Sequence, residues 1–128
     1  MLTYRVATAD DAKRLFDWRN DPLTCAMSKS PEPVEWEGHV RWLDARLARP
    51  EPDIFVVEKA GEPVGTFRLD AGEVSYTVAP EHRRKGVATA MLEIIKRDFG
   101  RMKAEIYPRN TASIKAARAA GMEVILLT

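Results

Sequence analysis

The chain has 128 residues, of which 45% are hydrophobic and 30% charged, and its formal net charge is +1. This balance predicts one globular domain over residues 1–128, and it excludes a disordered chain and a nucleic-acid coat protein with a global positive field. The single cysteine, Cys25, excludes an internal disulfide and a cysteine-rich metal site, no apolar run approaches the roughly 20 residues of a membrane span, and no export signal is visible. We therefore expect a cytoplasmic protein that binds no metal, no membrane and no nucleic acid.

The amino-terminal part begins with a predicted strand and helix. Residues 2–7 alternate well enough to form a strand. Thr8 and Asp11 then have the spacing of a capping box, which precedes an apolar pattern of helical period. We expect this first helix to end near Asp21 and Pro22, because proline cannot continue a helix.

A second helix and three strands follow in the prediction. The apolar residues of 34–48 recur at helical spacing, and Pro50 and Pro52 end this helix. The next segments alternate between turn residues and β-prone runs, with a glycine-containing hairpin turn between the first two runs. We expect strands at residues 54–58, 64–69 and 73–78.

The carboxyl-terminal part alternates helices and strands. Apolar residues at helical spacing from Ala88 to Phe99 predict a helix that Gly100 ends. A short strand over 102–107, an alanine-rich helix over 111–120 and a last strand over 123–127 complete the chain. The fold class is α/β (α+β): a mixed central sheet flanked by helices, in the order strand, two helices, three strands, then helix, strand, helix, strand.

The segment from Val78 to Ala88 is the most informative in the chain. A β-prone run breaks at Pro80, passes into the basic turn Arg83-Arg84-Lys85-Gly86, and opens a helix. The first turn of a helix presents free amides and the positive end of the helix dipole, and glycine lets a ligand approach the backbone. This pattern predicts a phosphate cradle; the alternative interpretation is a solvated basic loop.

These residues resemble the GNAT superfamily of acetyl-CoA-dependent N-acetyltransferases. The acyl-CoA signature of that family is Arg or Gln, two residues, Gly, one residue, then Gly or Ala, and it matches Arg83, Gly86 and Ala88. A second block, with Asn110 and Ser113 followed by Gly121 and Met122, is similar to the family's segment around its last helix. The resemblance covers nearly the whole chain and implies a GNAT-like fold.

The resemblance also implies what the cradle holds. In the family, acetyl-CoA lies with its diphosphate on the amides of this turn, and its pantetheine arm lies between two strands that diverge. An amide-bearing arm can complete the backbone hydrogen bonds that such a strand pair leaves open. The implied cofactor-binding residues are Val78, Arg83, Arg84, Lys85, Gly86, Val87, Ala88, Thr89, Asn110 and Ser113.

Attack of an amine on the thioester needs a route for a proton out of the site and, preferably, an acid for the departing thiolate. Glu73 is the candidate for the first task through water, although an exposed edge carboxylate is the alternative. Many family members carry a tyrosine where this chain has Ala117, so the general acid is unassigned. Tyr107 and Ser113 are candidates, and water could serve because a thiol of pKa about 8.5 is a good leaving group.

The acceptor is expected to be a small-molecule amine bound by the amino-terminal third of the chain. Arg19 and Asn20 suit sugar hydroxyls or a nucleotide phosphate. His39, a second candidate base, shares a helix face with Trp42, which could stack on a base or sugar. Helix capping and core packing are the alternatives. The segment resembles a GNAT branch that acetylates nucleotide-linked amino sugars in nonulosonic acid pathways.

Other functions fit the same residues. A protein N-terminus, a polyamine or an aminoglycoside could be the acceptor, although Arg19 argues weakly against a polyamine. A non-catalytic acyl-CoA-binding module is the interpretation from another class, and Ala117 is its main support. Members of the resembled family usually have two strands after the last helix, whereas here only residues 124–127 are left to form one. The resemblance therefore implies a sheet that lacks or borrows its final strand, and an exposed edge of this kind favours a homodimer.

Overall fold

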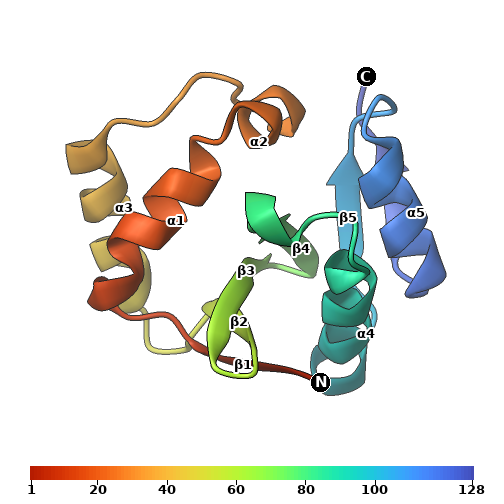
Figure 1. Ribbon diagram of the computed structural model, residues 1–128, viewed down its shortest axis with the longest axis horizontal. Coiled ribbons are helices and arrows are strands. Elements are labelled where there is room, and N and C mark those ends of the chain that lie inside the picture. The colour runs from red at the N-terminus through yellow and green to blue at the C-terminus, as the bar shows by residue number, and fades with distance from the viewer.

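A computed structural model describes all residues, 1–128. Six strands form one sheet in sequence order, and five helices cover it (Figure 1). The strands are β1 (Leu2–Val6), β2 (Ile54–Lys59), β3 (Glu62–Asp70), β4 (Glu73–Val78), β5 (Lys103–Ile106) and β6 (Glu123–Leu126). The helices are α1 (Ala12–Arg19), α2 (Pro22–Met27), α3 (Trp36–Leu47), α4 (Val87–Phe99) and α5 (Thr111–Ala119), with short 3₁₀ turns at Ala9–Asp11 and Pro80–His82.

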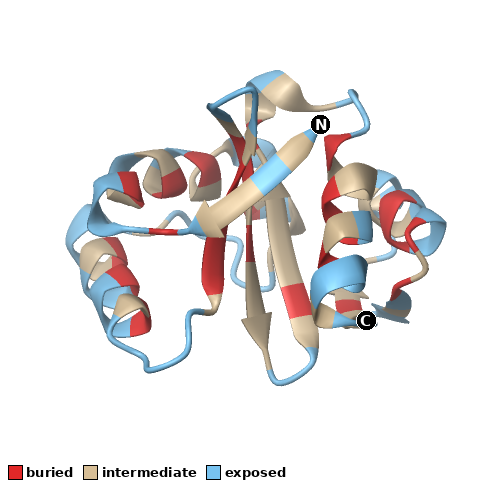
Figure 2. Ribbon diagram, turned by 90° about the horizontal axis from the view of Figure 1, so that it is seen from below, coloured by how far each residue is buried: buried red, intermediate tan, exposed pale blue.

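The helices lie in two layers on opposite faces of the sheet (Figure 2). The helices α1 and α3 pack on one face through Leu15, Trp18 and Leu43, against Ile54 and Val56 of β2. The helices α4 and α5 cover the other face. None of the helices combines the length and apolarity that crossing a membrane requires. The predicted mixed sheet flanked by helices is therefore confirmed.

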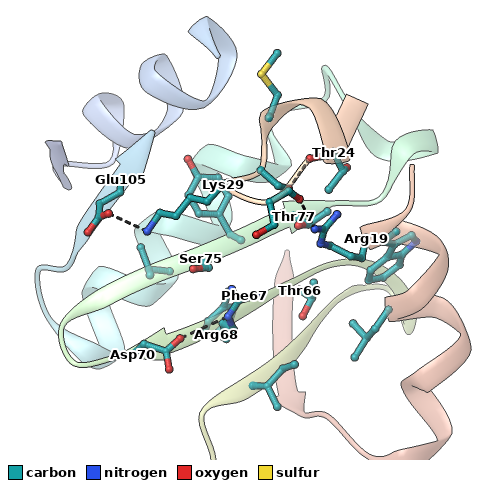
Figure 3. Close-up of a pocket in the computed structure, with 18 of the residues that line it drawn as sticks. Arg19, Thr24, Lys29, Thr66, Phe67, Arg68, Asp70, Ser75, Thr77 and Glu105 are labelled. Atoms are coloured by element: carbon teal, nitrogen blue, oxygen red, sulfur yellow. Dashed lines mark hydrogen bonds and ion pairs between the residues drawn. The ribbon is translucent and has the colours of Figure 1, made fainter. Parts of the chain in front are cut away.

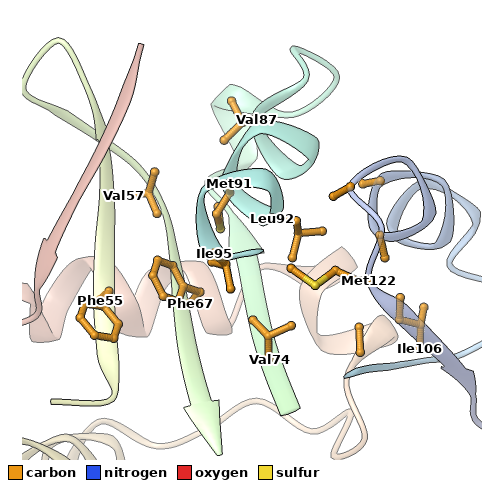
Figure 4. Close-up of a cluster of buried hydrophobic side chains, with 14 of the residues drawn as sticks. Phe55, Val57, Phe67, Val74, Val87, Met91, Leu92, Ile95, Ile106 and Met122 are labelled. Atoms are coloured by element: carbon orange, nitrogen blue, oxygen red, sulfur yellow. The ribbon is translucent and has the colours of Figure 1, made fainter. Parts of the chain in front are cut away.

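The larger core lies between the sheet and α4 and α5 (Figure 4). Met91, Leu92 and Ile95 of α4 are at most 1% exposed, and they pack on strand residues such as Phe67 and Val74. The spacing of these three residues, four and three apart, is the helical periodicity on which the sequence prediction rested. Burial of this stripe fixes α4, and with it the turn that precedes α4, relative to β4.

The pairing of β4 with β5 is unlike the rest of the sheet. The first four strands are antiparallel, and β4 pairs with β3 along its whole length, from Glu73 with Asp70 to Val78 with Gly65. In contrast, β4 and β5 are parallel and pair only at Glu73 with Lys103. Beyond that pair the two strands diverge toward their carboxyl ends, which opens the sheet between them.

One helix was missed by the sequence prediction. We expected the chain to leave the helical state near Asp21 and Pro22, but α2 begins at Pro22. The Asp21 side chain accepts a hydrogen bond from the Thr24 amide at 3.2 Å, and proline is well suited to the first position of a helix because its missing N–H would have no partner there. α1 ends at Arg19, and the Asp21-Pro22 pair that was predicted to mark its end instead starts α2.

The last strand, β6, pairs in parallel with β5 from Lys103 with Glu123 to Ile106 with Leu126. It forms the edge of the sheet, and its Ile125 and Leu126 side chains are exposed. Association of two copies through this edge stays a prediction.

The predicted capping box at Thr8 is part of a larger charge network. Asp11 is 1% exposed, and its carboxylate accepts hydrogen bonds from the Thr8 amide at 2.8 Å, from two nitrogens of Arg5 at 2.8 Å and from Arg14 at 2.5 Å. Burial of Asp11 favours its neutral form, but the Arg5 guanidinium and the Thr8 amide outweigh burial and lower the pKa of Asp11 from 3.8 to about 2. This network joins β1 to the start of α1.

We predict that Asp11→Asn lowers the free energy of unfolding at pH 7 by about 1–3 kcal/mol, because the amide cannot replace the charged acceptor. Since the folded-state pKa of Asp11 is depressed, its contribution is complete above about pH 4 and is lost as the pH falls toward 2. Urea denaturation of both proteins across this range measures the difference. The matched control is Asp17→Asn, which removes an exposed pair with Lys13 and should cost at most about 0.5 kcal/mol. An equal loss at pH 7 and at pH 2.5 for Asp11→Asn would contradict the assignment.

Candidate functional site

A cavity of about 850 Å³ lies between the sheet and α1, α2 and α3, and it extends through the opening between β4 and β5 (Figure 3). Glu73, Ser75 and Thr77 alternate along β4 and face these three helices, whereas Val74 and Tyr76 face α4 and α5. Residues from both faces of the sheet line the cavity, so we call it a passage through the sheet.

Some of the residues predicted for the site line this cavity and others do not. Those that line it are Arg19, His39, Trp42, Glu73, Asn110 and Ser113. Those that do not are Asn20, Val78, Tyr107 and residues 83–89.

The backbone of β4 contributes to this passage. The Ala79 amide donates to the Val64 carbonyl at 2.8 Å, so the odd-numbered residues of β4 bond to β3 in the antiparallel ladder. The amides and carbonyls of Tyr76 and Val78 consequently point the other way, toward β5, where the strand pairing has ended. They form a row of hydrogen-bonding groups that a ligand with its own amides can complete.

The turn before α4 carries a second set of free backbone groups. Gly86 has a φ of 77° and Arg84 a φ of 63°, and these left-handed residues fold the chain back on itself ahead of α4. The chain supplies no acceptor for the amides of residues 84–89, and the first intrahelical bond runs from the Ala90 amide to the Gly86 carbonyl at 3.1 Å. Together with the dipole of a helix of 13 residues, these amides make a site for an anion.

The basic side chains of this turn differ in what they contact. The Arg83 guanidinium donates to Asp21 at 2.5 Å and to Thr24 at 3.0 Å, so it joins the turn to the start of α2. Although burial of Asp21 acts in the opposite direction, the bond from Arg83 lowers the pKa of Asp21. Arg84 and Lys85 are exposed and form no ion pair within the chain. The structure therefore gives Arg83 a structural contact, and it leaves Arg84 and Lys85 available to a ligand.

Two carboxylates face each other across the opening between β4 and β5. Glu73 is the only residue of β4 that pairs with β5. Glu105 lies on β5, where Figure 3 shows its side chain beside Lys29, and both carboxylates line the cavity. Between them is the ammonium of Lys29, whose Nζ is 3.3 Å from Glu73 Oε2 and 2.8 Å from Glu105 Oε1. The bond from Lys29 is the main cause that lowers the pKa of Glu105, and the bond to Glu105 raises the pKa of Lys29.

Sequence reasoning did not find Tyr76. Its ring lies on the face of the sheet that α5 covers, and its hydroxyl hydrogen-bonds the Ser113 hydroxyl and the Ser113 carbonyl, the latter at 3.3 Å. Burial raises the pKa of Tyr76, and the bond with Ser113 opposes this only in part. A signal was present in the sequence, because Tyr76 is two residues after Val74 and so lies on the same, buried face of the strand. A tyrosine in that position is usually interpreted as a packing residue, so no function was predicted for it.

Asn110 and Ser113 are joined at the start of α5. The Asn110 side chain caps this helix by accepting from the Ser113 amide at 3.3 Å. Ala117, one turn further along the helix, is fully buried. The only hydroxyls at this end of the cavity on the α5 side are therefore those of Ser113 and Tyr76.

The predicted residues of α3 form an aromatic wall of the cavity. His39 is 6% exposed, lies among Phe16, Trp36 and Trp42, and has its Nε2 3.0 Å from the Ala12 carbonyl. Burial lowers the pKa of His39, so the imidazole is neutral and Nε2 donates to the carbonyl. Trp42 is more exposed, and the guanidiniums of Arg46 and Arg68 lie 5.7 Å and 5.6 Å from its ring centre.

Arg19 and Asn20 hold the segment that joins α2 to α3. The Arg19 guanidinium donates to the Ser30 carbonyl at 2.6 Å. Both ends of the Asn20 amide bond to the backbone of Val34, at 2.9 Å and 2.8 Å, and Asn20 lies outside the cavity. These contacts give Asn20 a structural role, and its contact with a substrate stays a prediction.

Tyr107 also lies away from the cavity. The Arg109 guanidinium lies 4.3 Å from the centre of its ring, and Arg109 donates to the Ala26 carbonyl at 2.9 Å. The Tyr107 ring therefore supports a contact between the segment before α5 and α2. No three His, Cys, Asp or Glu side chains are grouped as a metal site would require.

Comparisons with known proteins identify the fold and the family. The family model described as "Acetyltransferase (GNAT) domain" matches residues 1–123. No protein of curated function matches the chain in sequence. Among solved structures, a domain from Methanocaldococcus jannaschii is similar with a TM-score of 0.77 and 20% identity, over 94% of this chain and 87% of that one.

Two further similar structures contain the coenzyme. The protein yncA from Salmonella typhimurium, solved with its cofactor acetyl-CoA, has a TM-score of 0.68 and 26% identity over 94% of this chain and 78% of that chain. The aminoglycoside acetyltransferase AAC(6′)-Ib, solved with coenzyme A, has a TM-score of 0.74 and 17% identity over 94% of this chain and 83% of that chain.

We predict that Gly86→Asp weakens binding of coenzyme A at least about tenfold relative to Gly86→Asn, measured by isothermal titration calorimetry. A side chain at Gly86 meets no atom within 4 Å, and Asn and Asp both tolerate a positive φ, so the two variants differ mainly in charge. A carboxylate among the amides of residues 84–89 repels a diphosphate. Equal affinities of the two variants would show that the anion binds elsewhere.

Proposed function

The chain belongs to the GNAT acetyltransferase family and is an acetyl-CoA-dependent acyltransferase; we propose that its acceptor is the primary amine of a nucleotide-linked amino sugar. The observation that carries the proposal is the passage through the sheet, which is lined by carboxylates at the strand opening and by Arg68 and Trp42 on β3 and α3. The first group suits an amine, and the second suits a phosphate and a planar base.

The residues of the cradle and of β4 fit acetyl-CoA. We propose that the free amides of residues 84–89 bind the diphosphate, and that the exposed side chains of Arg84 and Lys85 add charge there. The row of unpaired groups at Tyr76 and Val78 suits the amides of the pantetheine arm, and Asn110 and Ser113 line the same opening. Acetyl-CoA supplies the activated acyl group.

Glu73 is the proposed base. An amine arrives protonated at neutral pH and must lose a proton before it can attack. Glu73 and Glu105 already hold one primary ammonium, that of Lys29, at 3.3 Å and 2.8 Å. A pair of carboxylates that binds an ammonium at the strand opening can both position an acceptor amine and receive its proton. His39 faces the same cavity, but its Nε2 is engaged with a backbone carbonyl.

Tyr76 is the proposed general acid. Burial keeps its hydroxyl protonated at neutral pH, and the hydroxyl lies beside Ser113 on the side of the strand opening where Ala117 offers no donor. In this proposal Tyr76 donates a proton to the departing sulfur, and Ser113 orients the phenol. This role replaces the sequence-based candidate Tyr107, whose ring lies outside the cavity.

The wall of the cavity formed by Trp42 and Arg68 supports the choice of acceptor. Trp42 is partly exposed, and Arg68 on β3 lies 5.6 Å from its ring centre while also lining the cavity. An indole beside a guanidinium can stack on a nucleobase and bind a phosphate oxygen. A simple polyamine has neither a nucleobase nor a phosphate that this wall could bind.

An aminoglycoside is the second candidate acceptor. The carboxylates of Glu35 and Asp70 line the cavity in addition to Glu73 and Glu105, and acidic walls suit a polycation. One of the structurally similar proteins is an aminoglycoside acetyltransferase. The two acceptors differ in charge, so they make opposite demands on Arg68.

A screen for thiol release tests the proposal. The protein is incubated with acetyl-CoA and, separately, with nucleotide-linked amino sugars, aminoglycosides, polyamines and peptides. We expect turnover with the nucleotide-linked amines, and we expect Glu73→Gln to lower kcat at least about tenfold at unchanged affinity for acetyl-CoA. Turnover confined to aminoglycosides would favour the second candidate, and binding of acetyl-CoA with no turnover would favour a non-catalytic module.

Replacement of Tyr76 tests the general acid. We predict that Tyr76→Phe lowers kcat about tenfold with little change in KM, a modest effect because a thiolate is a good leaving group. Ser113→Ala is the matched control, since it removes the partner of the phenol but keeps the phenol, and its effect should be smaller. An unchanged kcat in Tyr76→Phe would mean that water protonates the sulfur.

A further inference from the structure

Lys29 is the only lysine that lines the cavity. It lies on the segment between α2 and α3, 44 residues from Glu73 and 76 residues from Glu105 in sequence. Two contacts hold this segment: Arg19 donates to the Ser30 carbonyl at 2.6 Å, and the Ser28 hydroxyl donates to the Thr24 carbonyl at 2.6 Å. A third holds the end of α2 that precedes it, where Arg109 donates to the Ala26 carbonyl at 2.9 Å. The approach of its amine to the two carboxylates is thus supported by the backbone on both sides.

The amine is placed where the proposed function requires an acceptor. Glu73 marks the last point at which β4 and β5 pair, and Glu105 lies on the other strand of the opening. The Lys29 ammonium bridges the two carboxylates, and its bond to Glu105 is drawn in Figure 3. If Glu73 accepts the proton of an acceptor amine, then Lys29, whose Nζ is 3.3 Å from Glu73, meets the same condition.

We propose that Lys29 is an acetylation site, modified within the same molecule by the chain's own active site; this inference rests on the proposed function. The Lys29 ammonium gives one proton to Glu73, and the neutral nitrogen attacks the thioester carbonyl carbon. A C–N bond forms and the C–S bond breaks. The thiolate takes up one proton, the second nitrogen proton leaves to solvent, and the products are acetyl-Lys29, free coenzyme A and one proton.

Acetylation changes the site that carries it. The amide of acetyl-Lys29 has no charge and cannot bridge Glu73 and Glu105 as an ammonium does. The two carboxylates then become available to an external cationic amine. Unmodified Lys29 is a competitor of the acceptor, and the modified side chain is not.

Two labelling reactions on the intact protein test the proposal, with Lys59 as the internal reference because it is exposed and forms no ion pair. The protein is incubated with acetyl-CoA and no acceptor, and acetylation of each lysine is followed by peptide mass mapping. We expect Lys29 to react at least about tenfold faster than Lys59, at a rate per molecule that does not depend on protein concentration. With acetic anhydride and no acetyl-CoA, the order should reverse, because the two carboxylates hold Lys29 as an ammonium.

The variants separate the causes. Lys29→Arg keeps a cation at this position and should lose the modified peptide, and Glu73→Gln should lower the acetyl-CoA reaction of Lys29 while leaving Lys59 unaffected. Equal rates for Lys29 and Lys59 with acetyl-CoA, a rate that rises with protein concentration, or equal rates with acetic anhydride would each overturn the proposal. If Lys29 stays unmodified while an external amine is acetylated, this inference fails and the proposed function stands. If neither reaction occurs, the proposed function itself fails.

Discussion

The divergence of β4 from β5 is the constraint on which the site depends. Two strands that pair at one position only leave backbone amides and carbonyls along both edges without strand partners, and such groups are costly to bury unless something else bonds to them. The fold resolves this by keeping the opening accessible as a cavity. The same opening gives a thin, amide-bearing molecule a place within the sheet, so the property that weakens the sheet creates the binding site.

Strand alternation then sorts the chemistry onto two faces. Along β4, Glu73, Ser75 and Thr77 face α1, α2 and α3, whereas Val74 and Tyr76 face α4 and α5. The carboxylates that suit an amine are therefore on one face of the opening, and the phenol that suits a departing sulfur is on the other. In the proposed mechanism, a proton is accepted on one face of the sheet and supplied from the other. The core under α4 buries Val74 of the same strand and so fixes which face of β4 each side chain takes (Figure 4).

Much of this could be predicted from the sequence, because the signals were local. The cradle depends on glycine, on helix geometry and on free amides, all of which follow from residues 83–89 alone. What sequence reasoning missed depends on contacts between distant segments. Arg83 meets Asp21 across 62 residues, and Tyr76 meets Ser113 across 37. The sequence predicted a substrate contact for Asn20 because its side chain is polar, but it gave no sign that this side chain bonds to the backbone of Val34. The α2 helix was missed for another reason: in a sequence, an Asp-Pro pair can mark either the end of one helix or the start of the next.

The contact of Arg83 with Asp21 joins the turn before α4 to the start of α2. Arg83 lies in the turn that carries the free amides, and its guanidinium donates a hydrogen bond to Asp21, the N-cap of α2. The segment that contains Lys29 directly follows α2. Any anion on the turn that competes with Asp21 for this guanidinium also loosens one wall of the acceptor cavity. The affinities of the two ligands are then thermodynamically linked, with equal effect in both directions. A ligand that binds at either place therefore changes the affinity of the protein for the other ligand.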